Sequence, residues 1–242
     1  MGTKVAFVAG ATGFTGRAMA AQDPARHDVE LRLQVRPGSR GGHKLEQDRR
    51  VVSVDLADRI ALEDALLGVD CVVQLIGTVR ARFAETGDYE AVDYGTTLRL
   101  LDAAKLRQVP HFLLVSSVGA GHPIGEYLRW KKRTEDAVRQ SGLPYTIVRP
   151  SYLAGDEMFP ERAQLSATSA FLRGFSESMF GGGLAADLRP INIQVLARVL
   201  LSLVRDGATR RVLVGRHLWH IAREQRLYDF VDGNSAELAR RA

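Results

Sequence analysis

The sequence predicts an α/β protein built on an open, doubly wound and mostly parallel sheet. Short β-branched, apolar segments alternate with longer amphipathic segments, which is the pattern of parallel strands joined by crossover helices. The first apolar segment, residues 5–9, runs directly into a glycine-rich loop that opens a helix. The 242 residues, 45% hydrophobic and 25% charged, suffice for one large buried core. We therefore expect a single domain over residues 1–242.

The expected elements follow this alternation along the chain. The strands are residues 5–9, 31–35, 51–54, 71–75, 112–115, 145–148 and 211–214. The helices are residues 14–21, 58–67, 89–107, 126–140 and 192–205. Gly142-Leu-Pro144 and Asp206-Gly207 indicate the ends of the last two helices.

Residues 155–190 interrupt the alternation after the sixth strand. This segment is rich in Phe and Met and contains Gly181-Gly-Gly183, a hinge-like sequence. We interpret it as a small C-terminal substrate cap within the one domain, and its aromatic content favours a partly apolar substrate. The polar residues 228–242 are expected to fray.

Composition argues against several classes of partner. The net charge is +5, but Lys and Arg are interspersed with acids, so no nucleic-acid interface is predicted. There is neither a signal-peptide pattern nor an apolar segment long enough to span a membrane, and we expect a cytoplasmic protein. The single cysteine, Cys71, lies in an apolar segment and is expected to be buried and inert.

The loop Gly10-Ala-Thr-Gly13-Phe-Thr-Gly16 has the spacing of a dinucleotide-binding loop. Gly10 permits a tight turn, Gly13 lets backbone N–H groups approach a pyrophosphate, and Gly16 allows the helix to pack closely on the strand. Because the loop follows an apolar strand and opens a helix, it predicts a Rossmann-type domain. The expected cofactor contacts in this loop are Gly10, Thr12, Gly13, Phe14, Thr15 and Gly16.

The end of the second expected strand predicts which dinucleotide binds. An acid at this position would accept hydrogen bonds from the adenosine ribose, whereas an arginine favours a 2′-phosphate. The segment Leu33-Gln-Val-Arg36-Pro-Gly-Ser-Arg40 contains no acid. We therefore expect NADP(H), held by Arg36, with Arg17, Arg40 and Lys44 as lesser candidates.

A candidate catalytic pair lies at the start of the fourth expected helix. Tyr127 and Lys131 are four residues apart, so a helix places them on one face. A free phenol has a pKa of about 10, and a neighbouring ammonium stabilises the phenolate, which suits Tyr127 to acid–base chemistry. The pair follows Ser116-Ser117 at the carboxyl end of a strand, where such sheets bind ligands.

These residues resemble the atypical short-chain dehydrogenase/reductase superfamily, most closely its NmrA-like and Tat-interacting oxidoreductase branches. The resemblance covers nearly the whole chain. The segments that carry it are residues 10–16, Asp55-Leu56, Ile76-Gly-Thr78, Val115-Ser-Ser117 and Tyr145-Thr-Ile-Val-Arg-Pro150.

The resemblance implies roles for further residues. Asp55 and Leu56 would flank the adenine, Ile76 and Gly77 would line the diphosphate and ribose, and Ser151 to Leu153 would lie by the nicotinamide. Lys131 would also hold the nicotinamide ribose. Ser117 is the expected serine that orients a substrate carbonyl, with Ser116 the alternative because successive residues of a strand point to opposite sides. The ten-residue interval from Ser117 to Tyr127 is shorter than is usual in the superfamily.

The sequence thus predicts an NADPH-dependent reductase of a small carbonyl substrate, with Tyr127 as proton donor. The alternative is a redox sensor that binds NADP(H) without turnover. A nucleotide-sugar epimerase is disfavoured because the region after Pro150 is short. His217 and His220 lack further metal ligands at a suitable spacing, and we expect a late strand and its turn there. The lack of a Gly-x-Ser-x-Gly sequence argues against hydrolysis, and the sequence does not predict an oligomeric state.

Overall fold

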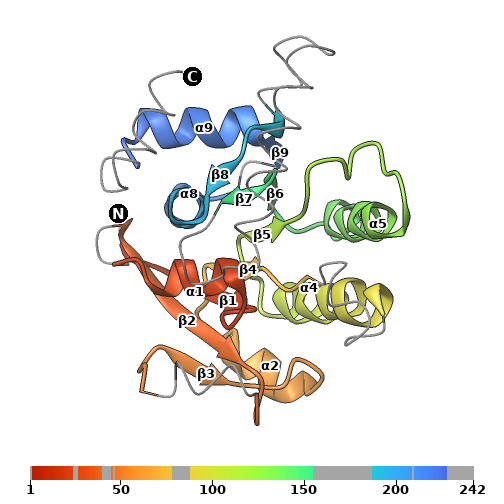
Figure 1. The fold of residues 1–242 in the computed structure, drawn as a ribbon. Helices are drawn as coiled ribbons and strands as arrows, with labels where there is room; N and C mark the ends of the chain where they lie inside the picture. The colour runs from red at the N-terminus through yellow and green to blue at the C-terminus, as the bar shows by residue number, and fades with distance from the viewer. Residues whose placement is uncertain are drawn as a thin grey trace, which may run out of the picture.

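The computed structural model describes residues 2–23, 27–39, 45, 47–77, 88–154, 187–208 and 210–227. Its centre is a seven-stranded parallel sheet with the order β3-β2-β1-β4-β5-β6-β9 (Figure 1). The strands are β1 Lys4–Ala9, β2 Val29–Val35, β3 Val51–Ser53, β4 Cys71–Gln74, β5 Phe112–Val115, β6 Tyr145–Arg149 and β9 Arg211–Val214. All seven expected strands are therefore present.

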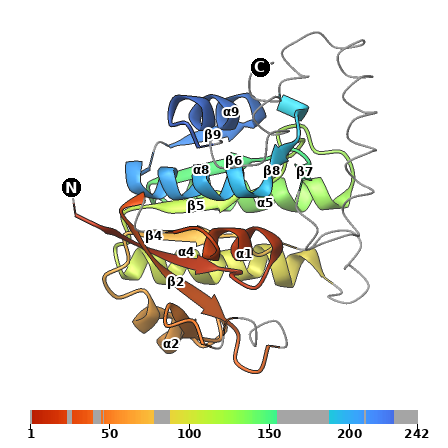
Figure 2. The same ribbon diagram turned by 60° about the vertical axis from the view of Figure 1, so that its left-hand side comes forward.

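Helices cover both faces of the sheet. They are α1 Phe14–Ala20, α2 Arg59–Ala65, the π-helix η4 Glu90–Gly95 that continues as α4 Thr96–Leu106, α5 Glu126–Gln140, α8 Ile193–Asp206 and α9 Gly215–Glu224. Helices α1, α8 and α9 pack on one face, whereas α2, α4 and α5 pack on the other (Figures 1 and 2). This arrangement confirms the doubly wound α/β fold.

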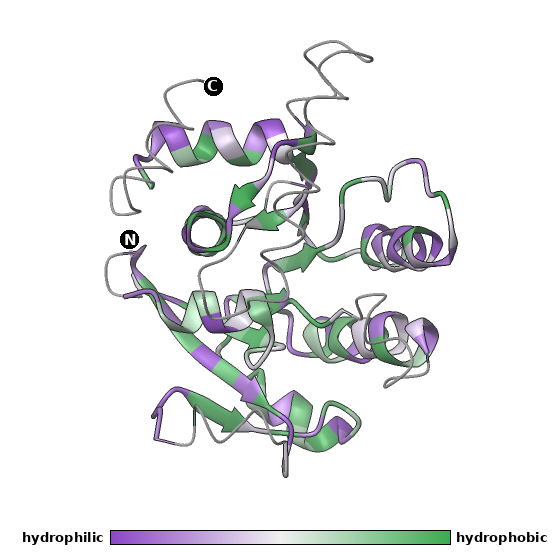
Figure 3. Ribbon diagram, in the orientation of Figure 1, coloured by the Kyte–Doolittle hydropathy of each residue, from purple (hydrophilic) through white to green (hydrophobic). Residues whose placement is uncertain are grey.

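The two apolar cores arise from the alternation of side chains along each strand. In β1, Ala6 and Val8 face α1 and α8, while Phe7 and Ala9 face α2 and α4. A strand buried on both faces reads as a continuous apolar segment, and Figure 3 shows mostly hydrophobic strands in the centre of the sheet. Helix α8 is also largely hydrophobic and contributes ten buried residues, whereas α5 is mostly hydrophilic.

The strand order places a topological switch point between β1 and β4. From β1 the chain moves outward to β2 and β3, then returns to β4 on the other side of β1. Sheets of this kind bind ligands in the crevice outside the carboxyl ends of the two strands at the switch point. Here those ends are Ala9 and Gln74, which pair in register.

Helix ends agree with the sequence signals. Gly142, with a φ of +82°, follows the end of α5, and Gly207, with a φ of +87°, follows the end of α8. Glycine adopts this left-handed conformation without a Cβ penalty. Cys71 is buried, as expected, and burial raises the pKa of its thiol.

Three features differ from the sequence expectations. The segment from Arg216 to His220, expected as a late strand and its turn, belongs to helix α9. The cause is the burial of Leu218, Trp219 and Ala222 at helical spacing. In addition, a two-stranded parallel sheet pairs β7 Leu153–Ala154 with β8 Ile191–Asn192, and the expected helix from residue 89 begins as a π-helix.

Several expectations fall outside the described residues. They are most of the proposed cap, including its glycine segment, the tail from residue 228, and the side chains of Arg40 and Lys44. Within the described ranges, no helix is both long and apolar enough to cross a membrane.

Candidate functional site

The glycine-rich loop lies at the carboxyl end of β1, and its outer glycines are required by the chain's own packing. Gly10 has a φ of +91°, and a Cβ there would lie 3.0 Å from the backbone nitrogen of Ile76. A Cβ on Gly16 would lie 2.3 Å from the carbonyl oxygen of Gly10 and 2.6 Å from the Cα of Ala11. Real Cβ atoms do not approach other atoms so closely, and Gly16 therefore lets α1 pack against the loop.

Gly13 differs from the other two glycines. Its φ of −73° is open to any residue, and the nearest atom to a Cβ there would be the Gly10 carbonyl oxygen at 3.2 Å. Gly13 precedes α1 and its N–H donates to the Gly10 carbonyl at 3.0 Å. The fold therefore requires glycine less strictly here than at Gly16. This fits a glycine whose role is to let a ligand approach the backbone.

The other loop residues are partly buried. Thr12, Phe14 and Thr15 are neither fully exposed nor fully buried, and Phe14 packs against the core under α1. The Arg17 guanidinium folds back and donates to the Thr12 carbonyl at 2.6 Å. Arg17 therefore braces the loop.

Two buried glutamines, which the sequence interpretation missed, hold the crevice in shape. Gln34 in β2 accepts from the N–H of Gly10 at 3.4 Å and donates to the Val54 carbonyl at 2.8 Å. Gln74 in β4 accepts from the N–H of Ile76 at 2.8 Å and donates to the Thr97 hydroxyl at 2.9 Å. For Gln74, a polar residue at the end of an otherwise apolar strand was the available signal.

Arg36 follows the end of β2 in a tight turn. The Ser39 N–H donates to the Arg36 carbonyl at 3.0 Å, with Pro37 and Gly38 between them and Gly38 at a φ of +69°. Pro followed by a left-handed Gly is typical of a type II turn. The Arg36 side chain is exposed and forms neither an ion pair nor a hydrogen bond with the described part of the chain.

Asp55 and Leu56 follow β3, the strand next to β2. Asp55 is exposed and accepts from the N–H of Ala57 at 2.9 Å. Leu56 is buried in the core under α2. Asp55 is therefore the member of this pair with an accessible side chain.

Lys131 lies at the carboxyl end of β4 although it belongs to α5. Its Nζ donates to Asp93 Oδ1 at 2.7 Å, and both residues are buried. The same nitrogen would lie 2.6 Å from a Cβ on Gly77, so it is in contact with the backbone that follows β4. Burial disfavours the ammonium, but Asp93 and then Tyr127 outweigh it, and the pKa of Lys131 is raised above its ordinary value.

Tyr127 lies one helical turn before Lys131, on the same face of α5, as the spacing predicts. The Lys131 Nζ is 5.7 Å from the centroid of the Tyr127 ring. The Tyr127 ring also packs against the Tyr89 ring, with centroids 5.8 Å apart. Tyr127 is half-buried, whereas Tyr89 is buried.

The two serines differ in their surroundings. The Ser116 N–H continues the sheet ladder by donating to the Val148 carbonyl at 2.7 Å. Strand alternation from Leu114 therefore places Ser116 on the face that α5 covers. Its hydroxyl is buried and has no hydrogen-bond partner among the described residues. Ser117 is half-buried, and its hydroxyl donates to the Val118 carbonyl at 3.2 Å.

Ser151 and Leu153 follow β6 at the same edge of the sheet. The Ser151 hydroxyl donates to the Arg189 carbonyl at 2.5 Å, so it connects this segment to the chain that leads into β8. Leu153 pairs with Ile191 in the small sheet and packs against the core on the α8 side. On the α4 side, Ile76 packs against the other core, and Gly77 is exposed.

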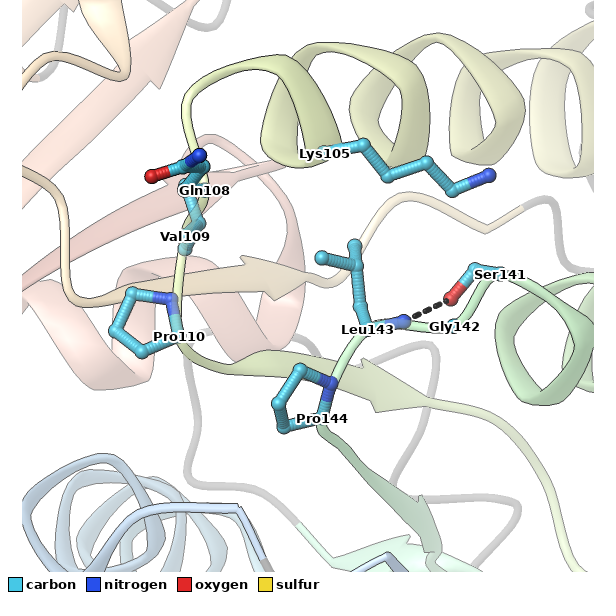
Figure 4. A pocket seen from close by; sticks show the side chains of 8 residues that line it. All are labelled: Lys105, Gln108, Val109, Pro110, Ser141, Gly142, Leu143 and Pro144. Atoms are coloured by element: carbon cyan, nitrogen blue, oxygen red, sulfur yellow. Dashed lines mark hydrogen bonds between the residues drawn. The ribbon is translucent and has the colours of Figure 1, made fainter.

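A hollow of about 470 Å³ lies at the opposite edge of the sheet (Figure 4). The lining residues come from the end of α4 and from the loops that lead into β5 and β6: Lys105, Gln108, Val109, Pro110, Ser141, Gly142, Leu143 and Pro144. None of the candidate site residues lines it. Within the described ranges, no three His, Cys, Asp or Glu side chains are grouped as metal ligands.

The glycine loop at the switch point defines the class of protein: a dinucleotide-binding domain of the Rossmann type. A family model described as NAD(P)H-binding matches residues 10–174, and the chain belongs to this family of oxidoreductases. Its membership of the atypical short-chain dehydrogenase/reductase superfamily is confirmed.

Known proteins resemble the chain over part of their length. Protein TIC 62 of Pisum sativum is 31% identical over 174 residues, which are 60% of this chain and 32% of that protein. Ceramide reductase of Caulobacter vibrioides is 32% identical over 181 residues, which are 72% of this chain and 55% of that protein. The chain therefore spans from about a third to about half of the length of these two relatives.

A solved structure shares the fold. The UDP-N-acetylglucosamine 4-epimerase from Methanobrevibacter ruminantium superposes with a TM-score of 0.59 at 18% identity, covering 88% of this chain and 76% of that one.

Proposed function

We propose that this chain is an NADP(H)-dependent reductase in which Tyr127 donates a proton to the oxygen of a carbonyl-type substrate. The observation that carries the proposal is the position of the Lys131 ammonium. It lies against Gly77 at the ligand-binding edge of the sheet and 5.7 Å from the Tyr127 ring. A charged group buried at that edge suits acid–base work more than a solvated helix face would.

The chain's residues fit a nicotinamide dinucleotide. Gly13 keeps the loop open to a pyrophosphate, and the fold itself makes a weaker demand for glycine there than at Gly16. Arg36 presents an exposed guanidinium just after β2, without a hydrogen-bond partner among the described residues, as a 2′-phosphate requires. On this proposal, the loop from Gly10 to Gly16, Asp55 and the backbone of Ile76 and Gly77 would hold the rest of the cofactor.

Bound there, the cofactor would supply the hydride. The residues of the chain then have two tasks, of which the first belongs to Tyr127 and Lys131. As the phenol of Tyr127 gives its proton to the substrate oxygen, the charge of Lys131 stabilises the phenolate that remains.

The second task is to orient the substrate oxygen, and it falls to the pair Ser116 and Ser117. Ser117 is the serine that the resemblance favours. The hydroxyl of Ser116 is buried on the face that α5 covers and has no partner in the described part of the chain, which supports Ser116 instead. Separate replacement of each serine by Ala distinguishes the two, because only the loss of the orienting serine should lower turnover strongly.

A small, partly apolar molecule is the proposed substrate. Ceramide reductase, which matches 72% of this chain, is named for the reduction of a lipid. That likeness supports both the reductase activity and an apolar body for the substrate.

A screen of aldehydes, ketones and quinones with NADPH, followed by absorbance, tests this function. Lys131→Met should abolish turnover of any substrate found and weaken NADPH binding. Lys132→Met is the matched control, because Lys132 pairs with Asp136 on the outer face of the same helix, at 2.6 Å. Tight NADPH binding without turnover across the screen would favour the redox sensor.

A further inference from the structure

The buried ion pair between Asp93 and Lys131 joins two helices at the candidate site. Asp93 belongs to η4 and Lys131 to α5, and their side chains are 2% and 9% exposed. Removing two charges from water is costly unless the pair has good geometry, and the 2.7 Å contact meets that condition. The sequence interpretation assigned no role to Asp93.

Asp93 is itself fixed by a chain of hydrogen bonds to β4. The Thr97 hydroxyl donates to the Asp93 carbonyl at 2.7 Å and accepts from Gln74 at 2.9 Å. Gln74 in turn binds the N–H of Ile76, next to Gly77. Asp93 and the edge against which Lys131 lies are thus held by one connected set of contacts.

The helix is a π-helix over the turn that contains Asp93. Such turns are rare and occur frequently at functional sites. Here η4 ends at Gly95, and an ordinary α-helix continues from Thr96.

Among the described residues, few other charges lie on the elements around the pair. Tyr89, just before η4, packs on Tyr127, and Glu90, the first residue of η4, is exposed. From β6, Arg149 is paired with Glu135 of α5 at 2.6 Å. Neither β4 nor β5 contains a charged side chain. Asp93 is therefore the carboxylate bonded to the Lys131 ammonium.

We infer that Asp93 is a positioning residue whose carboxylate fixes the Lys131 ammonium against Gly77 and keeps it charged beside Tyr127. Without that carboxylate, burial would favour the neutral amine. The catalytic consequence rests on the proposed function, since a neutral lysine could not stabilise the Tyr127 phenolate. The fixing and charging of Lys131 do not depend on turnover.

Lysine titration by NMR tests the inference directly. The chain has five lysines, and in ¹³C-lysine-labelled protein the Lys131 signal is identified by its loss in Lys131→Arg. In the unaltered protein, Lys131 should stay protonated to a pH above the ordinary lysine pKa of about 10.4. Asp93→Asn, which keeps the shape of the side chain, should lower its midpoint by at least about one pH unit.

Asp136→Asn is the matched control, because it removes a carboxylate that pairs with Lys132 on the surface of the same helix. It should leave the Lys131 midpoint unchanged. A Lys131 midpoint that stays the same in Asp93→Asn would overturn the inference. Should Asp93→Asn fail to fold, the unaltered protein decides, since a Lys131 midpoint below the ordinary lysine pKa of about 10.4 would also overturn it.

The pH dependence of turnover gives a second measurement. With a substrate from the screen, Asp93→Asn should move the alkaline limb of kcat/KM to lower pH by about the same interval as the NMR midpoint. An unmoved limb beside a lowered NMR midpoint would contradict the proposed role of Lys131 in catalysis, while the inference about Asp93 would stand. An unmoved limb and an unmoved midpoint together would overturn the inference itself.

Discussion

Arg149 and Glu135 form a two-bonded ion pair that ties the carboxyl end of β6 to the middle of α5. The Arg149 Nε and one terminal nitrogen donate to the two carboxylate oxygens at 2.8 and 2.6 Å. Glu135 has no exposed surface, and it lies one turn after Lys131. The other terminal nitrogen of Arg149 would be 2.7 Å from a Cβ on Gly121. The ion pair is therefore also in contact with the loop before α5.

Glu135→Gln should therefore destabilise the fold by about 3 kcal/mol, because it leaves a largely buried guanidinium without its counter-charge. Urea unfolding measures the change. Asp136→Asn breaks a partly exposed pair on the same helix and should cost less than about 0.5 kcal/mol. Equal effects of the two substitutions would contradict the structural role of the Arg149–Glu135 pair.

Gly13→Ala and Gly16→Ala should separate binding from folding. At Gly16 a Cβ would collide with backbone at 2.3 Å, so Gly16→Ala should lower the unfolding temperature markedly. At Gly13 the nearest atom would be at 3.2 Å, so Gly13→Ala should fold but bind NADPH at least about tenfold more weakly, or 1.4 kcal/mol. Unchanged NADPH affinity in Gly13→Ala would argue against the loop as the pyrophosphate site.

Arg36 should determine the choice of dinucleotide. The unaltered protein should bind NADPH at least about tenfold more tightly than NADH. Arg36→Glu should remove or reverse that preference, since a carboxylate repels the 2′-phosphate and accepts hydrogen bonds from ribose hydroxyls. Titration calorimetry with both dinucleotides measures the ratio, and equal affinities in the unaltered protein would exclude this role.

The fold was largely predictable because its central strands, β1, β4, β5 and β6, are buried on both faces. Each reads as a short apolar segment, and the seven expected segments coincide with strands to within two residues. Helix α9 was missed because basic residues and histidines interrupt its apolar positions, and the spacing of Leu218, Trp219 and Ala222 was the signal that remained. The β7–β8 pair has two residues per strand, too few to give any periodicity.

The candidate site was predictable where its residues are close in sequence. The loop from Gly10 to Gly16 and the Tyr127–Lys131 pair each lie within one turn or loop. Asp93 was not found because it precedes Lys131 by 38 residues, and their contact depends on how η4 packs on α5. Only the folded chain places these residues together.

His111 should make the protein sensitive to acid. Its Nε2 lies 3.0 Å from the Thr146 hydroxyl, and burial lowers the pKa of His111 to about 4. The unfolded chain binds this proton near its ordinary pKa of about 6.5, so stability falls as the pH drops from about 6.5 to about 4. Between pH 7.5 and 5 the loss from this residue should be about 2 kcal/mol.

Urea unfolding at pH 7.5 and at pH 5 gives the change in the free energy of unfolding for the unaltered protein and for His111→Gln. The loss due to His111 is the difference between these two changes. Other groups that titrate cancel in that comparison. A stability difference between the two proteins that does not change with pH would contradict the buried, neutral state of His111.

Replacement of Tyr127 by Phe tests the proposed reductase most directly, because it removes one hydroxyl and keeps the ring that packs on Tyr89. On a substrate found by the screen, Tyr127→Phe should lower kcat by roughly a hundredfold or more and leave the affinity for NADPH within a few-fold. Full turnover by Tyr127→Phe would contradict the assignment of Tyr127 as the proton donor.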